Sequence, residues 1–522
     1  MIELDNTEDF SGSKNQNDSW IIEAIWGHRI ERQPFSALML EFLGMAEGMY
    51  RQKKLFAHTS PSDNPIYVAN RSLQLRNILF NNPQMEEILR NSLGDDASAW
   101  EKWLEVMKIS ASVGENLSPD FSYLKNNFET FGELVNVVRL LRNITIDQES
   151  ERGWTTQFIF PIGPAALYEA LLERGDKFER TRRVFTRTGE LGYLMVSRAS
   201  EELRNKIERK LAHSFDPNGA RNKLVLRLLS SDEPDKGEKK SGTYLPYKTH
   251  PAYNRMAEDI SAILDLDLPD QDSFEFIQPL LGLHIYLYGI ETASHWVGTP
   301  EMPPMVCEIL APRSDLVRKA AVASYLDNDG LGSQAVRTFI DTTLFSDPDL
   351  KRMLANNEAD DESKRDYLLH FLEKSCALNK EGMANAPDTK SLIQNFYSFA
   401  DKFYRSYAAD GLTGLATGCG FVSRRGTTRF RYAPTDGLLR ALVLANVTAP
   451  VEEGAFLRRL YDRYRIVIGP VEAKATVRAT LFDETDFKKN RDRLVQHLIG
   501  MGLAQRMSDA CTYVLNPMDE HA

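Results

Sequence analysis

The sequence predicts a mainly α-helical protein with some β-structure (α+β), in which a multi-domain helical body carries a C-terminal winged-helix domain. Through most of the chain, apolar residues recur at three- and four-residue spacing, as on one face of a helix. The last forty residues combine an amphipathic helix with two short β-strands. The length of 522 residues is enough for several domains of roughly 100–200 residues each.

The N-terminal part is expected to be helical after a short polar segment. Residues 1–19 are polar and acidic without an apolar run, so we expect a flexible tail and no signal peptide. Residues 20–150 show helical spacing and are predicted to form an N-terminal helical domain. Within it Trp100, Trp103 and Met107 share one helix face and are expected in its core.

Residues 151–229 are predicted to be a helical segment with one short strand. The extended stretch 154–164 precedes helices expected at 165–174 and 177–211. Five cations begin the second helix: Lys177, Arg180, Arg182, Arg183 and Arg187. They fit either a phosphate-binding patch or a solvated face with internal ion pairs. Residues 230–243 are predicted to be a linker, because they are polar and contain Gly and Pro.

Residues 244–410 are predicted to be a middle, mostly helical domain. It includes a short strand at 305–310, helices at 315–325 and 333–342, and an amphipathic helix at 391–408. Glu308 lies on that strand and is a candidate metal ligand, but no second acid or histidine accompanies it. His250 is the histidine to test first for chemistry, although none of the nine histidines has metal-ligand spacing.

Residues 411–522 are predicted to be a winged-helix domain that also carries a basic hairpin. The hairpin holds four arginines within eight residues: Arg424, Arg425, Arg429 and Arg431. Alternation predicts Phe430 and Tyr432 on one face, and Arg429 and Arg431 on the other. Arginines interleaved with aromatic residues are typical of nucleic-acid contacts, yet a polar strand beside acidic neighbours has the same composition.

The final helix is expected at residues 484–499. Its apolar stripe comprises Phe487, Leu494, Val495 and Leu498. Asp483 or Thr485 can cap its start, and Gly500 and Gly502 can end it. Hairpin strands are expected at 503–507 and 512–515.

The distribution of charge favours DNA contact in the C-terminal domain. The chain has a net charge of −11, but from Gly420 onward sixteen Lys/Arg stand against twelve Asp/Glu. In a helix-turn-helix the final helix enters the major groove, where Lys and Arg contact phosphates and Arg or Gln pair with base edges. The predicted DNA-binding residues of this helix and of the hairpin after it are Lys488, Lys489, Arg491, Arg493, Gln496 and Arg506. Other winged helices bind protein, and Asp486 and Asp492 reduce the positive charge of this face.

Motifs of several enzyme classes are missing from the sequence. It contains no GxxxxGK[ST], HExxH or GxSxG, and its four cysteines have no CxxC spacing. We therefore expect no catalytic residue, no metal ion and no cofactor, and we favour a non-catalytic protein over an enzyme. The cysteine usage fits a reducing cytoplasm, and no run of eighteen apolar residues predicts a membrane span.

Two stretches carry a family resemblance: FERTRRVFTRTGELGYLMVSR at 178–198, and TGLATGCGF at 413–421 with RYAPTDGLLRALV at 431–443. With them the chain resembles the accessory, non-ATPase subunits of bacterial phage-defence and restriction systems linked to DNA modification by phosphorothioation or methylation. The resemblance implies a partner ATPase and a partner nuclease. The missing Walker motif agrees with such a role.

The leading hypothesis is a non-catalytic, double-stranded-DNA-binding and scaffolding subunit of a multi-protein anti-phage restriction complex. One alternative is a metal-dependent nuclease of unrecognised type that uses Glu308. Another is a winged-helix transcription regulator, which the long helical body disfavours.

Overall fold

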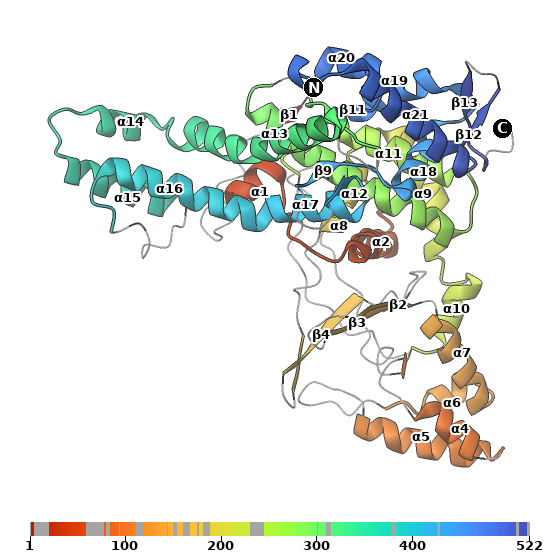
Figure 1. The fold of residues 1–522 in the computed structure, drawn as a ribbon. Helices are drawn as coiled ribbons and strands as arrows, with labels where there is room; N and C mark the ends of the chain where they lie inside the picture. The colour runs from red at the N-terminus through yellow and green to blue at the C-terminus, as the bar shows by residue number, and fades with distance from the viewer. Residues whose placement is uncertain are drawn as a thin grey trace.

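The computed structural model describes residues 2–4, 20–58, 78–79, 84–92, 94–110, 120–143, 145–149, 154–159, 168–174, 177–180, 188–229, 245–299, 301–309, 315–376, 383, 385–424, 429–507 and 511–518. Over these ranges the chain is mainly helical, as predicted (Figure 1).

Helix α12 (Asp270–Trp296) is the centre of the main body. It is apolar all round because other helices surround it, which is typical of a buried helix. Its neighbours include α2 (Phe35–Arg51), α11 (Pro251–Leu264), α17 (Asp410–Gly418) and α18 (Asp436–Asn446). Helices α1 (Trp20–Trp26), α8 (Thr188–Ser197) and α9 (Glu201–Leu211), with the 3₁₀ turn Ala212–Phe215, pack into the same core.

Two long helical stretches form an arm that projects from this body (Figure 1). One is α13 (Leu316–Phe339) with a π-helical extension, Ile340–Leu344, and the other is α16 (Thr389–Tyr404) with the π-helical segment Arg405–Ala409. Helices α14 (Pro348–Ala355) and α15 (Asp361–Cys376) connect them. The two helices expected at 315–325 and 333–342 are the single helix α13 and its π-helical extension. Gly332 lies within α13 against α16, where a Cβ would clash with Tyr404 Oη.

A second, smaller core lies apart from the main one. It is built by α4 (Met85–Asn91), α5 (Asp96–Ser110), α6 (Leu124–Asn127), α7 (Phe131–Asn143) and α10 (Ala220–Leu226). Trp100, Trp103 and Met107 are buried in it, which confirms the predicted core face. The range 20–150 is thus divided between two cores, because α1 and α2 belong to the main one.

An antiparallel four-stranded sheet occupies part of the range predicted to be helical. Its strands follow one another in the order β2 (Thr145–Glu149), β3 (Trp154–Ile159), β4 (Tyr168–Arg174) and β5 (Lys177–Arg180). The helix expected at 165–174 and the start of that expected at 177–211 were therefore wrong. Strands β4 and β5 are paired from Arg174 opposite Lys177 to Leu171 opposite Arg180. Such pairing between strands overrides the helix propensity of the individual residues.

The extreme N-terminus contains a strand where a flexible tail was expected. Strand β1 (Glu3–Leu4) pairs antiparallel with β6 (Tyr247–Thr249), so these two residues are part of the fold. Residues 5–19 and the predicted linker 230–243 lie outside the described residues.

The C-terminal module, defined here as α18 to β13, continues the main core. After α18 come β10 (Val451–Glu452), α19 (Glu453–Tyr464), β11 (Ile466–Val467), α20 (Pro470–Thr476) and the 3₁₀ turn Ala479–Leu481. Helix α21 (Glu484–Gly500) and strands β12 (Ala504–Arg506) and β13 (Thr512–Val514) complete it. The sheet order is β10-β13-β12, and β11 pairs in parallel with β7 (Met305–Val306) of the body.

Among the described residues, no helix combines the length and apolar character that crossing a membrane requires.

Candidate nucleic-acid interface

Helix α21 forms as the sequence predicts. The Asp483 carboxylate accepts a hydrogen bond from Asp486 N at 2.8 Å and so caps its first turn. The predicted apolar stripe is buried: Phe487, Leu494, Val495 and Leu498. Gly502, with φ +73°, supplies the left-handed backbone conformation just past the helix end.

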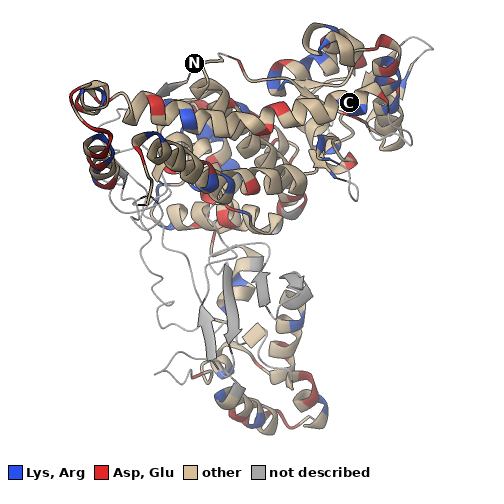
Figure 2. Cartoon of the chain, turned by 60° about the vertical axis from the view of Figure 1, so that its left-hand side comes forward, with Lys and Arg blue, Asp and Glu red and all other residues tan. Residues whose placement is uncertain are grey.

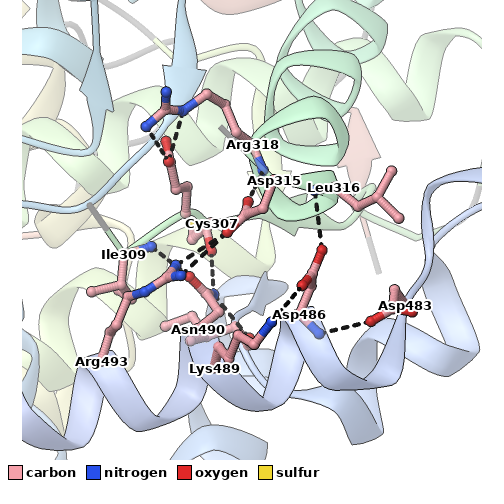
Figure 3. A network of polar contacts seen from close by, with 12 residues as sticks. Cys307, Ile309, Asp315, Leu316, Arg318, Asp483, Asp486, Lys489, Asn490 and Arg493 are labelled. Atoms are coloured by element: carbon pink, nitrogen blue, oxygen red, sulfur yellow. Dashed lines mark hydrogen bonds and ion pairs between the residues drawn. The ribbon is translucent and has the colours of Figure 1, made fainter. Parts of the chain in front are cut away.

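Asn490 fixes α21 to the parallel pair β7–β11 (Figure 3). Its Nδ2 donates to Cys307 O at 2.9 Å and to Ile468 O at 3.0 Å, and its Oδ1 accepts from Ile309 N at 2.8 Å. The side chain is completely buried. Three satisfied hydrogen bonds in a dry site hold the helix in one position relative to the body.

Arg493 faces the body instead of open solvent (Figure 3). Both its Nη1 and its Nη2 lie 3.3 Å from Asp315 Oδ2, and its side chain is 27% exposed. The other oxygen of Asp315 accepts from Arg318 N at 3.1 Å and caps α13. Asp486 accepts from Leu316 N at 3.4 Å at the same helix end. The first turn of α21 therefore docks on the start of α13.

The remaining cations of α21 also have acidic neighbours. They form the pairs Lys488–Glu484 at 2.8 Å, Lys489–Asp486 at 3.3 Å, Arg491–Asp492 at 2.8 Å and Arg491–Glu453 at 3.5 Å. The exposed side chains of the helix are Glu484, Thr485, Lys488, Lys489, Asp492 and Gln496. Acidic and basic positions are interspersed along the described helices (Figure 2). This face is mixed in charge, although two lysines and a glutamine point outward.

The basic hairpin has one buried and two exposed arginines among its described residues. Strands β8 (Val422–Ser423) and β9 (Arg431–Tyr432) pair antiparallel. Arg424 is exposed and lies over the Phe430 ring at 5.2 Å, and Arg429 is exposed. Arg431 and Tyr432 are both buried, so Arg431 does not share the exposure of Arg429. Arg425 lies outside the described residues.

Arg431 is buried against the carboxylate of Glu308, which compensates its charge. Its Oε2 accepts from Arg431 Nε, and its Oε1 accepts from Arg318 Nε at 2.8 Å. The Glu308 carboxylate is fully buried, and the Arg431 side chain is 3% exposed. Two guanidinium groups thus compensate one buried carboxylate, as a buried charge requires. Arg431 cannot reach an external ligand in this arrangement, and both oxygens of Glu308 are engaged.

The outer face of the β10-β13-β12 sheet is open to solvent. Tyr513 lies between Glu452 and Gln505 in register, and all three side chains are exposed. Arg506 is exposed at the end of β12, and the next residue, Met507, is 66% exposed. The β12–β13 hairpin therefore presents one cation, Arg506, next to the apolar side chain of Met507.

A buried network that the sequence did not indicate joins the C-terminal module to the body. Asp259 accepts from Tyr464 Oη at 2.6 Å and from Arg463, and lies 2.7 Å from His284 Nε2. Burial alone would raise the pKa of Asp259, but His284, Arg463 and Tyr464 together hold this pKa below its ordinary value. Burial lowers the pKa of His284, so a neutral imidazole donates Nε2–H to an ionised Asp259. The partners are far apart in sequence, and only the fold brings them together.

His250, the histidine singled out for chemistry, caps α11. Its Nδ1 accepts from Ala252 N at 3.1 Å, and burial holds its pKa well below the ordinary value. A neutral, buried acceptor accounts for this residue structurally. Lys177 and Arg180 of the predicted phosphate patch lie on β5, and residues 181–187 lie outside the described ranges.

Over the described part of the chain, no three His, Cys, Asp or Glu side chains form a group that could hold a metal ion. Comparison with known protein families gave no match, and a search of curated proteins found no similar sequence.

Proposed function

We propose that this protein is a DNA-binding and scaffolding subunit of a bacterial anti-phage restriction complex, and that its C-terminal module binds duplex DNA as a winged helix. One observation carries the DNA-binding part: α18, β10, α19, α21, β12 and β13 occur in this order, with β11, α20 and a 3₁₀ turn between α19 and α21, and the sheet order is β10-β13-β12. Helices followed by a terminal hairpin support the proposal that α21 is the recognition helix of a winged helix and that the β12–β13 hairpin is its wing. The ATPase and nuclease partners follow from the family resemblance alone.

We limit the residues proposed for DNA contact to exposed side chains on α21 and on the β12–β13 hairpin. Lys488, Lys489 and Gln496 are exposed on α21, and Arg506 is exposed on the hairpin. Lysines supply phosphate contacts and glutamine can read adenine, so these four residues form the proposed interface. We assign Arg431 and Asn490 to the support of the fold, because both are buried.

The test is a titration of fluorescently labelled duplex DNA with the full chain at several salt concentrations. The variant Lys488→Glu/Lys489→Glu removes two proposed phosphate contacts, so the slope of log K against log salt should decrease by about 2. Its affinity should fall roughly tenfold to a hundredfold at low salt.

The matched control is Lys351→Glu/Arg352→Glu. These two cations are also adjacent and exposed, but they lie on α14 of the arm, and Arg352 has its own acidic neighbour, Asp349. The control changes the net charge equally and should retain the affinity. Equal losses in both variants would refute the proposed interface.

A second candidate is a winged helix that docks a partner protein. The pairing of every cation of α21 with an acid favours it, as does the exposed apolar surface of Met507 and Tyr513. Aromatic and methionine side chains are enriched in protein interfaces. On this candidate the lysine variant leaves DNA binding unaffected, while Met507→Ser/Tyr513→Ser loses the co-purifying ATPase or nuclease.

A further inference from the structure

We propose that the ion pair between Asp315 and Arg493 is a latch that regulates the DNA-binding face of α21. When the pair is closed, it keeps Arg493 away from this face. The inference rests on the proposed function and assigns a regulatory role to a residue of the body. Asp315 precedes α13, whereas Arg493 belongs to the C-terminal module. The latch therefore couples the body to the proposed interface.

The position of Arg493 on α21 explains how the latch would affect DNA binding. Lys489 lies four residues before it and Gln496 three residues after it, so the three side chains form one row along α21. Lys489 and Gln496 are exposed, whereas Arg493 bends toward Asp315. With the pair closed the row presents one cation to DNA, and with the pair open it presents two.

Opening the latch requires only a side-chain movement. Both guanidinium nitrogens share a single carboxylate oxygen at 3.3 Å, and the pair is partly exposed, so it is weak. A phosphate that accepts two parallel hydrogen bonds from Arg493 is a stronger partner than this single carboxylate oxygen, because the other oxygen of Asp315 is engaged by Arg318 N. Asn490 meanwhile keeps α21 in place through its three buried hydrogen bonds. A partner protein that offers another cation to Asp315 therefore releases Arg493 without moving the helix.

The variant Asp315→Asn tests this coupling, because asparagine caps a helix as well as aspartate does but carries no charge. The full chain is titrated with the same labelled duplex. The variant should bind roughly two- to fivefold more tightly than the wild type, by the strength of one such pair. Its salt slope should increase by about 1, the value of one added phosphate contact.

The matched control is Asp327→Asn. Asp327 lies on α13 and pairs at 2.8 Å with Arg478, which is outside α21. It changes the net charge equally and should leave the affinity near that of the wild type. Arg493→Gln, added to each background, should abolish the gain of Asp315→Asn and have a smaller effect on the wild type.

An equal gain in Asp327→Asn, or a gain that survives Arg493→Gln, overturns the latch. If Lys488→Glu/Lys489→Glu weakens binding while Asp315→Asn has no effect, the latch fails and the proposed function stands. If the lysine variant leaves binding unchanged, or no variant binds DNA, the proposed interface fails and the latch with it.

Discussion

Replacing Asn490 should detach α21 from the body. Asn490→Ala removes three buried hydrogen bonds, each worth about 1 kcal/mol, and leaves Ile309 N–H without an acceptor at a further cost of about 1–3 kcal/mol. The local loss of stability is therefore roughly 4–6 kcal/mol. At 1.4 kcal/mol per factor of ten, this predicts that amide protection in α21 falls roughly several hundredfold to twenty-thousandfold.

Hydrogen exchange followed by mass spectrometry is the appropriate assay. The described residues form more than one hydrophobic core, so we do not expect the chain to unfold in one step, and a single melting curve would not report this local change. Peptides from α21, β7 and β11 should exchange faster, while peptides from α7 in the second core should not change. Asn205→Ala, an exposed position on α9, is the control variant.

A second variant separates hydrogen bonding from the loss of volume. Asn490→Asp keeps the size of the side chain but has no donors for Cys307 O and Ile468 O, so it should lose at least as much protection. If α21 in Asn490→Ala exchanges at the rate of the Asn205→Ala control, the reasoning is refuted.

Two further predictions concern buried charges. Burial raises the pKa of Glu47 from 4.5 to about 7, so the folded chain holds a proton that the unfolded chain has lost. The stabilisation is complete below pH 4.5 and is lost as pH rises to about 7, a change of roughly 3 kcal/mol. Glu47→Gln should flatten the pH dependence of amide protection in α2 over this range, measured by hydrogen exchange and corrected for the intrinsic exchange rate, whereas the exposed Glu101→Gln should not; a slope that persists contradicts the assignment. Arg431→Met should destabilise the fold by about 3–5 kcal/mol, because Glu308 stays buried with one of its two partners missing. Hydrogen-exchange protection of α13 and β9 that matches the exposed control Arg429→Met would contradict this role.

The sequence was sufficient to predict a helix or strand where the residues that determine it are close together in the chain. Helix α21 was predicted from its apolar spacing, its cap Asp483 and its terminating glycines, and all of these act within a few residues. The terminal hairpin was predicted for the same reason. The helix expected at 165–174 was wrong because Leu171 and Leu172 have high helix propensity, but pairing with β3 and β5 decides their conformation.

The candidate interface was predicted only in part because long-range partners determine which cations face solvent. Arg493 pairs with a residue 178 positions away, and Arg431 with one 123 positions away. Composition shows that arginines are present, but it does not show their acidic partners. The exposure of Lys489 follows from helix periodicity, since it lies opposite the apolar stripe, whereas Lys488 lies at the border of that stripe.

The parallel pairing of β7 with β11 limits how this protein can be dissected. The two strands come from positions some 160 residues apart, and Asn490 bonds to the backbone of both segments. A fragment of residues 411–522 would leave β11 without its neighbour and expose apolar side chains of α18 that face α12. Such a fragment should aggregate or remain unfolded, so experiments on the C-terminal module need the intact polypeptide.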